Sequence, residues 1–236
     1  MTATVIGVEA RSPVARVTAT SGSGTVLIPR LVTRTERSAQ VALVAGGAML
    51  LGGDRLRVRI SVGAGCTLEL TEVGGMVAYD ADGAPSSWSV EAVLEPGATL
   101  IWMGLETVVS GGANLTRSSR LSLADGACAL IRETTVLGRT GETGGRARLV
   151  SDVTCAGTPL LVEDFDVRGD RPVPGVCDDH RVVDTVLMAG RRPSDTAGAM
   201  RLDGPGALAR YLGRETHPSP IPEIWARWVD EVRAGS

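Results

Sequence analysis

Hydrophobic and polar residues alternate along residues 56–70. The even positions, from Leu56 to Leu70, are apolar or small, and the odd positions carry arginine, serine, glycine, threonine and glutamate. A period of two is typical of a β-strand with one buried face. Gly63 and Gly65 interrupt the run in its middle, as turn or bulge residues do. The pattern therefore predicts a strand, a tight corner and a second strand.

The same unit returns twice further along the chain. ISVGAGCTLELTE is followed by AVLEPGATLIWMGLE and by RLSLADGACALIRETTV, with corner glycines at Gly65, Gly97 and Gly126. Such a period is typical of stacked supersecondary units that bury their faces on each other. We therefore expect a mainly β fold, in which residues 1–200 form one domain, an elongated, layered or superhelical β-sheet body.

Helical patterns occur only late, and predict one or two short helices in a C-terminal segment, residues 201–236. The first candidate is Pro205–Leu212, with proline near its start and Gly213 after its end. The second is Pro222–Arg233, where apolar residues recur at helical spacing. Trp225 and Trp228 lie on its apolar stripe. Because tryptophans are common interface anchors, they predict a partner-binding surface; the alternative is a helix packed on its own domain.

Composition narrows the function. The net charge is −3, all 24 basic residues are arginine, and no basic face for nucleic acid is evident. Four widely spaced cysteines without a CxxC motif favour a reduced, cytosolic setting. The N-terminus lacks the apolar core of a signal peptide, and the longest apolar stretch is too short and glycine-rich to span a membrane. We expect a cytoplasmic protein without membrane or nucleic-acid partners.

Two local motifs have ordinary alternatives. Gly47–Gly52 matches half of a phosphate-binding loop, but Gly53 and Asp54 follow where lysine and a hydroxyl residue are required, so nucleotide binding is rejected. Cys177–His180, the sequence CDDH, groups possible metal ligands, yet lacks the second pair of a structural zinc site and also fits a polar loop. Two histidines and no nucleophile elbow leave no credible hydrolase triad.

Several acidic residues fall within or beside apolar strands. They are Glu69, Glu72, Glu106, Glu133 and Glu163. A carboxylate on an inner sheet face is costly unless it is paired, protonated, or in contact with metal or water. The alternative is that each of them faces solvent or pairs with an arginine such as Arg132 or Arg139.

Together these segments resemble the urease accessory protein D family, called H in some species. GGAMLLGGDRLRVRISVGAG is similar to the family's glycine-rich block and the strand pair after it. LEPGATLIWMGLETVVSGGANLTRSSRLSLADGACALIRETTVLGRTGE and GTPLLVEDFDVRGD resemble the next regions in the same order. The likeness runs from about Gly46 to Asp170. The sequence departs from the family where LET replaces QET at Leu105–Thr107.

The resemblance implies a scaffold rather than an enzyme. Members bind accessory protein F, which recruits the GTPase accessory protein G, and dock on urease apoprotein. The assembly delivers nickel, with carbon dioxide, along an internal route, so we expect no tightly bound cofactor and nickel only in transit. The alternative function is a β-solenoid hydrolase or a carbohydrate-binding module, against which the 3% aromatic content argues.

Within that resemblance, Asp54, Glu106 and Glu133 are the predicted nickel contacts. Glu106 and Glu133 follow their corner glycines by 9 and 7 residues, an even difference that preserves the sheet face. Glu72 follows Gly65 by 7 residues and extends the row. Carboxylates and water should hold Ni²⁺ only weakly, as transit requires.

Overall fold

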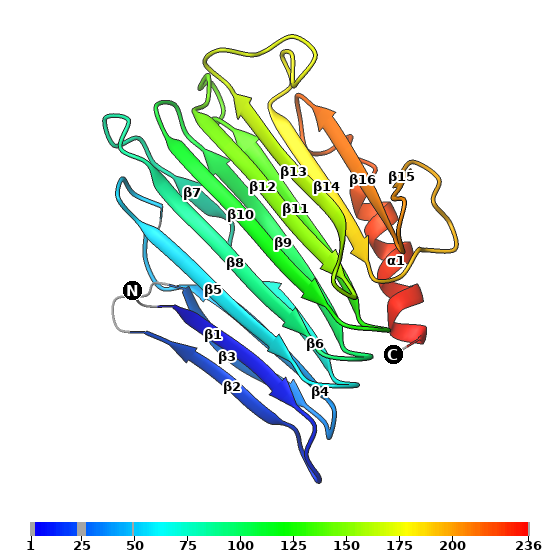
Figure 1. Cartoon of the computed structure of the whole chain (residues 1–236). Coiled ribbons are helices and arrows are strands. Elements are labelled where there is room, and N and C mark those ends of the chain that lie inside the picture. Colours follow the sequence, from blue (N-terminus) through cyan, green and yellow to red (C-terminus); the bar gives the residue numbers. More distant parts are fainter. Residues whose placement is uncertain (1–2, 23–26, 49, 236) are drawn as a thin grey trace.

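The computed structural model describes residues 3–22, 27–48 and 50–235, which form sixteen β-strands and one helix (Figure 1). The first eight strands are β1 (Thr4–Glu9), β2 (Arg16–Ser21), β3 (Leu27–Arg34), β4 (Ser38–Ala45), β5 (Arg55–Val62), β6 (Thr67–Glu72), β7 (Met76–Ala78) and β8 (Ser86–Leu94). The others are β9 (Thr99–Val109), β10 (Asn114–Leu123), β11 (Cys128–Leu137), β12 (Arg146–Cys155), β13 (Thr158–Arg168), β14 (Val182–Ala189), β15 (Met200–Arg201) and β16 (Gly206–Gly213), followed by α1 (Ile221–Ala234).

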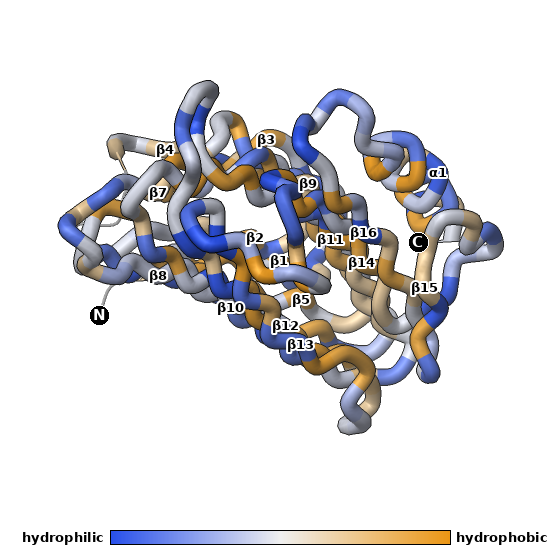
Figure 2. The backbone as a smooth tube through the Cα atoms, turned by 90° about the horizontal axis from the view of Figure 1, so that it is seen from above, coloured by the Kyte–Doolittle hydropathy of each residue, from blue (hydrophilic) through white to orange (hydrophobic). Residues whose placement is uncertain are grey.

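The strands form two sheets that face each other. Sheet A has the order β13-β12-β10-β8-β5-β1-β2, and sheet B the order β15-β16-β14-β11-β9-β6-β4-β3, with β7 paired to β9. Figure 2 shows the two layers from above, with α1 outside sheet B. The predicted mainly β, layered body is confirmed.

The chain passes from sheet A to sheet B at each repeated glycine corner. In sheet A, β8 pairs in parallel with both β5 and β10. In sheet B, β9 pairs in parallel with both β6 and β11. Gly65 N–H donates to Pro96 O, and Gly97 N–H donates to Asp125 O, both at 3.0 Å. The three glycines have φ between +60° and +69°, a conformation that favours glycine. The corners therefore stack on one another, which confirms the predicted repeat.

Two apolar cores result from this arrangement. The larger lies between the sheets and includes the fully buried Trp88 and Trp102. The second lies between the outer face of sheet B and α1. Among the described residues, no helix has the length and apolarity that crossing a bilayer requires.

The prediction of helices near the C-terminus is only partly correct. The prediction for Pro222–Arg233 is confirmed by α1, which has Pro222 in its first turn. The prediction of a helix at Pro205–Leu212 is wrong, because these residues form β16, paired with β14 from Gly206 to Gly213. Both faces of β16 are covered, so its sequence lacks the period of two of a half-exposed strand. Residues 200–213 thus belong to sheet B, and the helical segment begins at Ile221.

Candidate functional site

The glycine-rich stretch before β5 is a turn. Leu50 and Gly53 have positive φ, and the Asp54 carboxylate accepts a hydrogen bond from the Leu51 N–H at 2.9 Å. Asp54 is half-buried at the entry to β5, in the role of a turn acid. Met49, inside the rejected phosphate-loop match, lies outside the described residues.

A β-bulge separates the two glutamates that were expected to share one sheet face. Met103 pairs with Arg132 and Glu106 pairs with Thr134, so Gly104 and Leu105 together lie opposite Glu133. The extra residue reverses the parity of β9 beyond it. Glu106 is therefore exposed on the outer face, whereas Glu133 points between the sheets. The prediction that Glu106 shares the face of Glu133 is wrong, because counting residues along the chain does not reveal a bulge.

Glu72 has the predicted register. Thr71 pairs with Met103, so Glu72 lies beside Gly104, on the same inner face as Glu133. Its carboxylate accepts hydrogen bonds from Trp102 Nε1 at 3.2 Å and from the Leu105 N–H, freed by the bulge, at 3.0 Å. Burial raises the pKa of Glu72, while Arg117 and these donors lower it and Glu133 raises it. Glu72 is thus a buried acid whose carboxylate is held by the Trp102 indole and the Leu105 amide.

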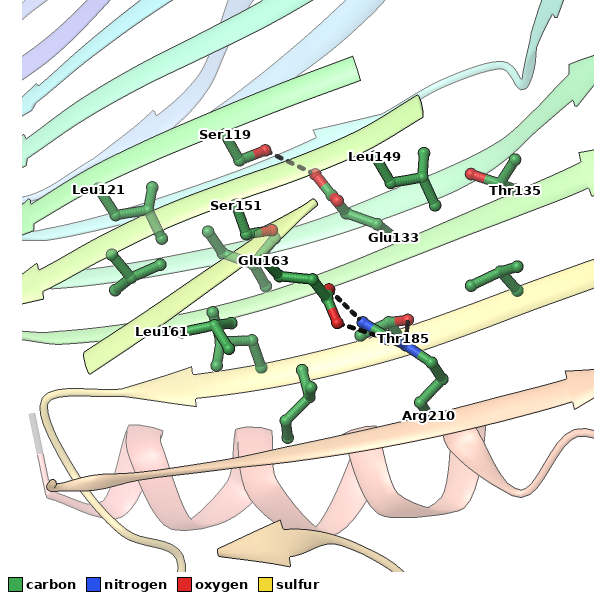
Figure 3. Close-up of a pocket in the computed structure, with 15 residues that line it drawn as sticks. Ser119, Leu121, Glu133, Thr135, Leu149, Ser151, Leu161, Glu163, Thr185 and Arg210 are labelled. Atoms are coloured by element: carbon green, nitrogen blue, oxygen red, sulfur yellow. Dashed lines mark hydrogen bonds and ion pairs between the residues drawn. The ribbon is translucent and has the colours of Figure 1, made fainter. Parts of the chain in front are cut away.

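Other polar residues continue this inner face across both sheets. In sheet B, Glu133 pairs with Thr185 and Thr185 pairs with Arg210. In sheet A, Ser119 pairs with Ser151 and Ser151 pairs with Glu163. We call the following set the interior polar row: Glu72, Arg117, Ser119, Glu133, Ser151, Glu163, Thr185 and Arg210. Figure 3 shows Glu133 and Glu163 pointing into the space between the sheets.

Two ion pairs in the interior polar row join the sheets. Arg117 of β10 donates to Glu133 Oε1 of β11 at 2.8 and 3.1 Å, and Ser119 Oγ donates to the same oxygen at 3.2 Å. Arg210 of β16 donates to both carboxylate oxygens of Glu163 of β13 at 2.6 and 2.7 Å. A cavity of about 50 Å³ lies between the sheets here, lined by Glu133, Glu163 and Arg210 among others. The site combines carboxylates, guanidiniums and hydroxyls around a small internal space.

The CDDH segment does not gather its side chains around one point. Cys177 is buried in the main core, and burial raises the pKa of its thiol. The His180 ring bonds to the Cys177 carbonyl at 2.9 Å, and Asp179 pairs with Arg214. Over the part of the chain that the structure describes, no three His, Cys, Asp or Glu side chains are grouped so as to hold a metal ion.

The two tryptophans of α1 belong to the second core. Trp225 and Trp228 are 9% and 1% exposed, and Trp228 Nε1 donates to the Asp195 carbonyl at 3.0 Å. The structure therefore has the alternative arrangement, a helix packed on its own domain. Glu69, on the outer face of β6, also has the alternative role: its carboxylate accepts two hydrogen bonds from Arg233 of α1.

Sequence reasoning missed Arg117 and Arg210. A signal for Arg117 exists, because it shares strand parity with Leu115, Leu121 and Leu123, which are all buried. Arg210 likewise shares parity with the buried Leu208, but β16 is covered on both faces, so no clear alternation marked this segment as a strand. A charged residue at an apolar-parity position is the pattern that both have in common.

Comparison with known proteins decides the family. The sequence profile of the UreD urease accessory protein family matches residues 3–230. The chain belongs to the UreD family. Urease accessory protein UreD 1 of Streptomyces griseus subsp. griseus is 39% identical over 216 residues, covering 90% of this chain and 85% of that protein. UreD 3 of the same organism is 33% identical over 201 residues, covering 81% and 77%.

A third relative, urease accessory protein UreD of a Parafrankia species, is 34% identical over 221 residues, covering 79% of this chain and 74% of that protein. The resemblance identified from the sequence motifs is confirmed. These relatives are named as urease accessory proteins and not as enzymes. The alternative of a hydrolase or carbohydrate-binding module has no support among them.

Proposed function

We propose that this chain is a scaffold that binds urease apoprotein together with accessory proteins F and G, and that nickel passes through the interior polar row on its way to urease. The interior polar row is the observation that carries the proposal. Removing charged groups from water costs several kcal/mol per ion, and well-packed apolar residues are often as stable or more stable. The fold itself therefore does not require charges between the sheets.

The chemistry of the interior polar row suits a cation in transit. Glu133 and Glu163 border the cavity, and Glu72 continues the row. Nickel is bound well by imidazole, whereas carboxylates, hydroxyls and water are the ligands of harder cations. Carboxylates spaced along the row would therefore bind Ni²⁺ weakly and release it, which is the property that delivery requires.

The test compares two glutamates that the bulge puts on opposite faces. The full chain is co-expressed with urease and accessory proteins F and G under limiting nickel. Glu133→Ala should leave the captured complex intact but lower both the nickel content of urease and its activity. Glu106→Ala, an exposed acid of the neighbouring strand, is the matched control and should do neither. Glu231 is a poorer control, because its carboxylate accepts hydrogen bonds from Ser194.

Two results would count against the proposal. Full nickel loading of urease with Glu133→Ala would remove this residue from the route. Failure of the unaltered chain to co-purify with urease or with accessory protein F would contradict the scaffold role.

A further inference from the structure

The two ion pairs of the interior polar row have opposite polarity. Arg117 reaches from sheet A to Glu133 of sheet B, whereas Glu163 reaches from sheet A to Arg210 of sheet B. The Arg117 and Arg210 side chains are only 6% and 16% exposed. Each carboxylate at the cavity thus has a guanidinium as its counter-ion. A cation entering the row meets carboxylates that are already occupied.

Both guanidiniums also contact an aromatic ring. Arg117 Cζ lies 3.6 Å from the centroid of a Trp88 ring, and Arg210 Cζ lies 5.0 Å from that of Phe165. A cation over an aromatic face is attracted by the negative potential of the ring. The guanidinium therefore keeps a favourable contact when its carboxylate turns to another cation. Trp88 is fully buried, and its Nε1 has no hydrogen-bond partner among the described residues, so the ring beside Arg117 carries an unpaired polar atom next to the row.

The charge of Arg117 acts on two carboxylates. It hydrogen-bonds Glu133 directly, and it also lowers the pKa of Glu72, which Glu133 raises. Loss of this guanidinium would leave Glu72 and Glu133 as neighbouring acids without a counter-ion. Like charges that share a buried site favour uptake of a proton or a cation.

Resting on the proposed function, we propose that Arg117 and Arg210 are resident cations that compete with the transported ion for the carboxylates of the interior polar row. A divalent cation displaces each guanidinium from its glutamate, the guanidinium stays on its aromatic ring, and it returns when the ion moves on. The competition keeps affinity low, so the row conducts and does not store nickel.

The alternative is that the pairs only hold the two sheets together. The two roles differ in what happens when the arginine is removed. Loss of a structural pair lowers stability and leaves metal affinity unchanged. Loss of a competing cation raises metal affinity, because the ion no longer has to displace it.

Calorimetric titration of the purified full chain with Ni²⁺ alone separates the two roles. Arg117→Gln should bind Ni²⁺ at least about tenfold more tightly than the unaltered chain, since close charge pairs couple by more than the 1.4 kcal/mol that a factor of ten requires. Arg120→Gln is the matched control: Arg120 lies on the same strand and loses the same charge, but its pair with Asp152 is exposed. Its affinity should not change.

Further variants keep the outcome decisive. Arg117→Gln combined with Glu133→Gln should lose the gain, because the freed carboxylate is gone. Arg210→Gln should repeat the gain independently. Unchanged or weaker affinity in folded Arg117→Gln and Arg210→Gln overturns the proposal. Failure of both variants to fold, with and without Ni²⁺, also overturns it in favour of purely structural pairs.

Urease activation distinguishes this inference from the proposed function. With Arg117→Gln, activation at limiting nickel should fall, because the chain retains the ion. Normal activation by the unaltered chain together with unchanged affinity in the variants refutes only the competing cations. Activation that does not depend on the unaltered chain refutes the proposed function itself.

Discussion

Strands β11, β14 and β16 carry different kinds of side chain on the two faces of sheet B. Their outer face meets α1 in an apolar core that contains Leu130, Met188 and Trp228. Burial there raises the pKa of Cys128 to about 11. The alternate residues of the same strands form the inner face, which carries Glu133, Thr185 and Arg210 around the cavity. The same three strands therefore have a mostly apolar outer face, which also holds the Arg132–Asp184 pair. Their inner face places Glu133 and Arg210 among apolar residues such as Leu187.

This difference distinguishes the apolar packing that stabilises the fold from the ion pairs that lie inside it. The outer core uses apolar side chains, the ordinary means of stabilising a sheet against a helix. The inner face keeps ion pairs where apolar packing would be at least as stable. We infer that the outer core supports the sheet so that its inner face can remain charged.

The largest expected effect is in the outer core. Trp228→Ala should lower the free energy of unfolding by about 3–5 kcal/mol, because it leaves a cavity under α1. Denaturant unfolding followed by circular dichroism measures this. Arg227→Ala, on the exposed side of the helix, should change stability by less than about 0.5 kcal/mol. Unaltered stability of Trp228→Ala with lost capture of accessory protein F would instead make this tryptophan a partner anchor.

The next effect tests how α1 is attached to the outer face of sheet B. Asp184 is 1% exposed and accepts hydrogen bonds from Arg132, Thr134 and Ser219, the last just before α1. Asp184→Ala should cost about 3 kcal/mol, because it leaves Arg132 unpaired in a mostly buried site.

Asp152→Ala is the control for Asp184→Ala. It breaks an exposed pair with Arg120 and should cost less than about 1 kcal/mol. Equal losses in the two variants would contradict the anchoring role of Asp184.

The smallest effect concerns the inner face and depends on pH. The pKa of Glu72 is raised by burial above its ordinary value of 4.5, so the folded chain holds this proton more tightly than the unfolded chain. Stability should therefore fall as pH rises from that value through the folded pKa. Glu72→Gln should lack this decline and differ by about 1 kcal/mol at the acidic end, where it loses a hydrogen bond. Parallel stability–pH profiles for the two proteins would be the contrary result.

The sequence alone determined the local structure. Alternation predicted the strands on both sides of the corner at Gly65, and equal offsets from corner glycines predicted that Glu72 and Glu133 share a register. The apolar stripe and Pro222 predicted α1. These features depend on residues close together in the chain, where side-chain periodicity and backbone preference act directly.

Only the tertiary structure decided the face of Glu106, the fate of residues 205–212 and the partners of the interior charges. The bulge at Gly104 and Leu105 is defined by pairing with a neighbouring strand. β16 loses its alternation because α1 covers one face and sheet A the other. Glu163 and Arg210 are 47 residues apart and meet only when the two sheets stack. Such contacts depend on how the layers close, and no short window of sequence contains that information.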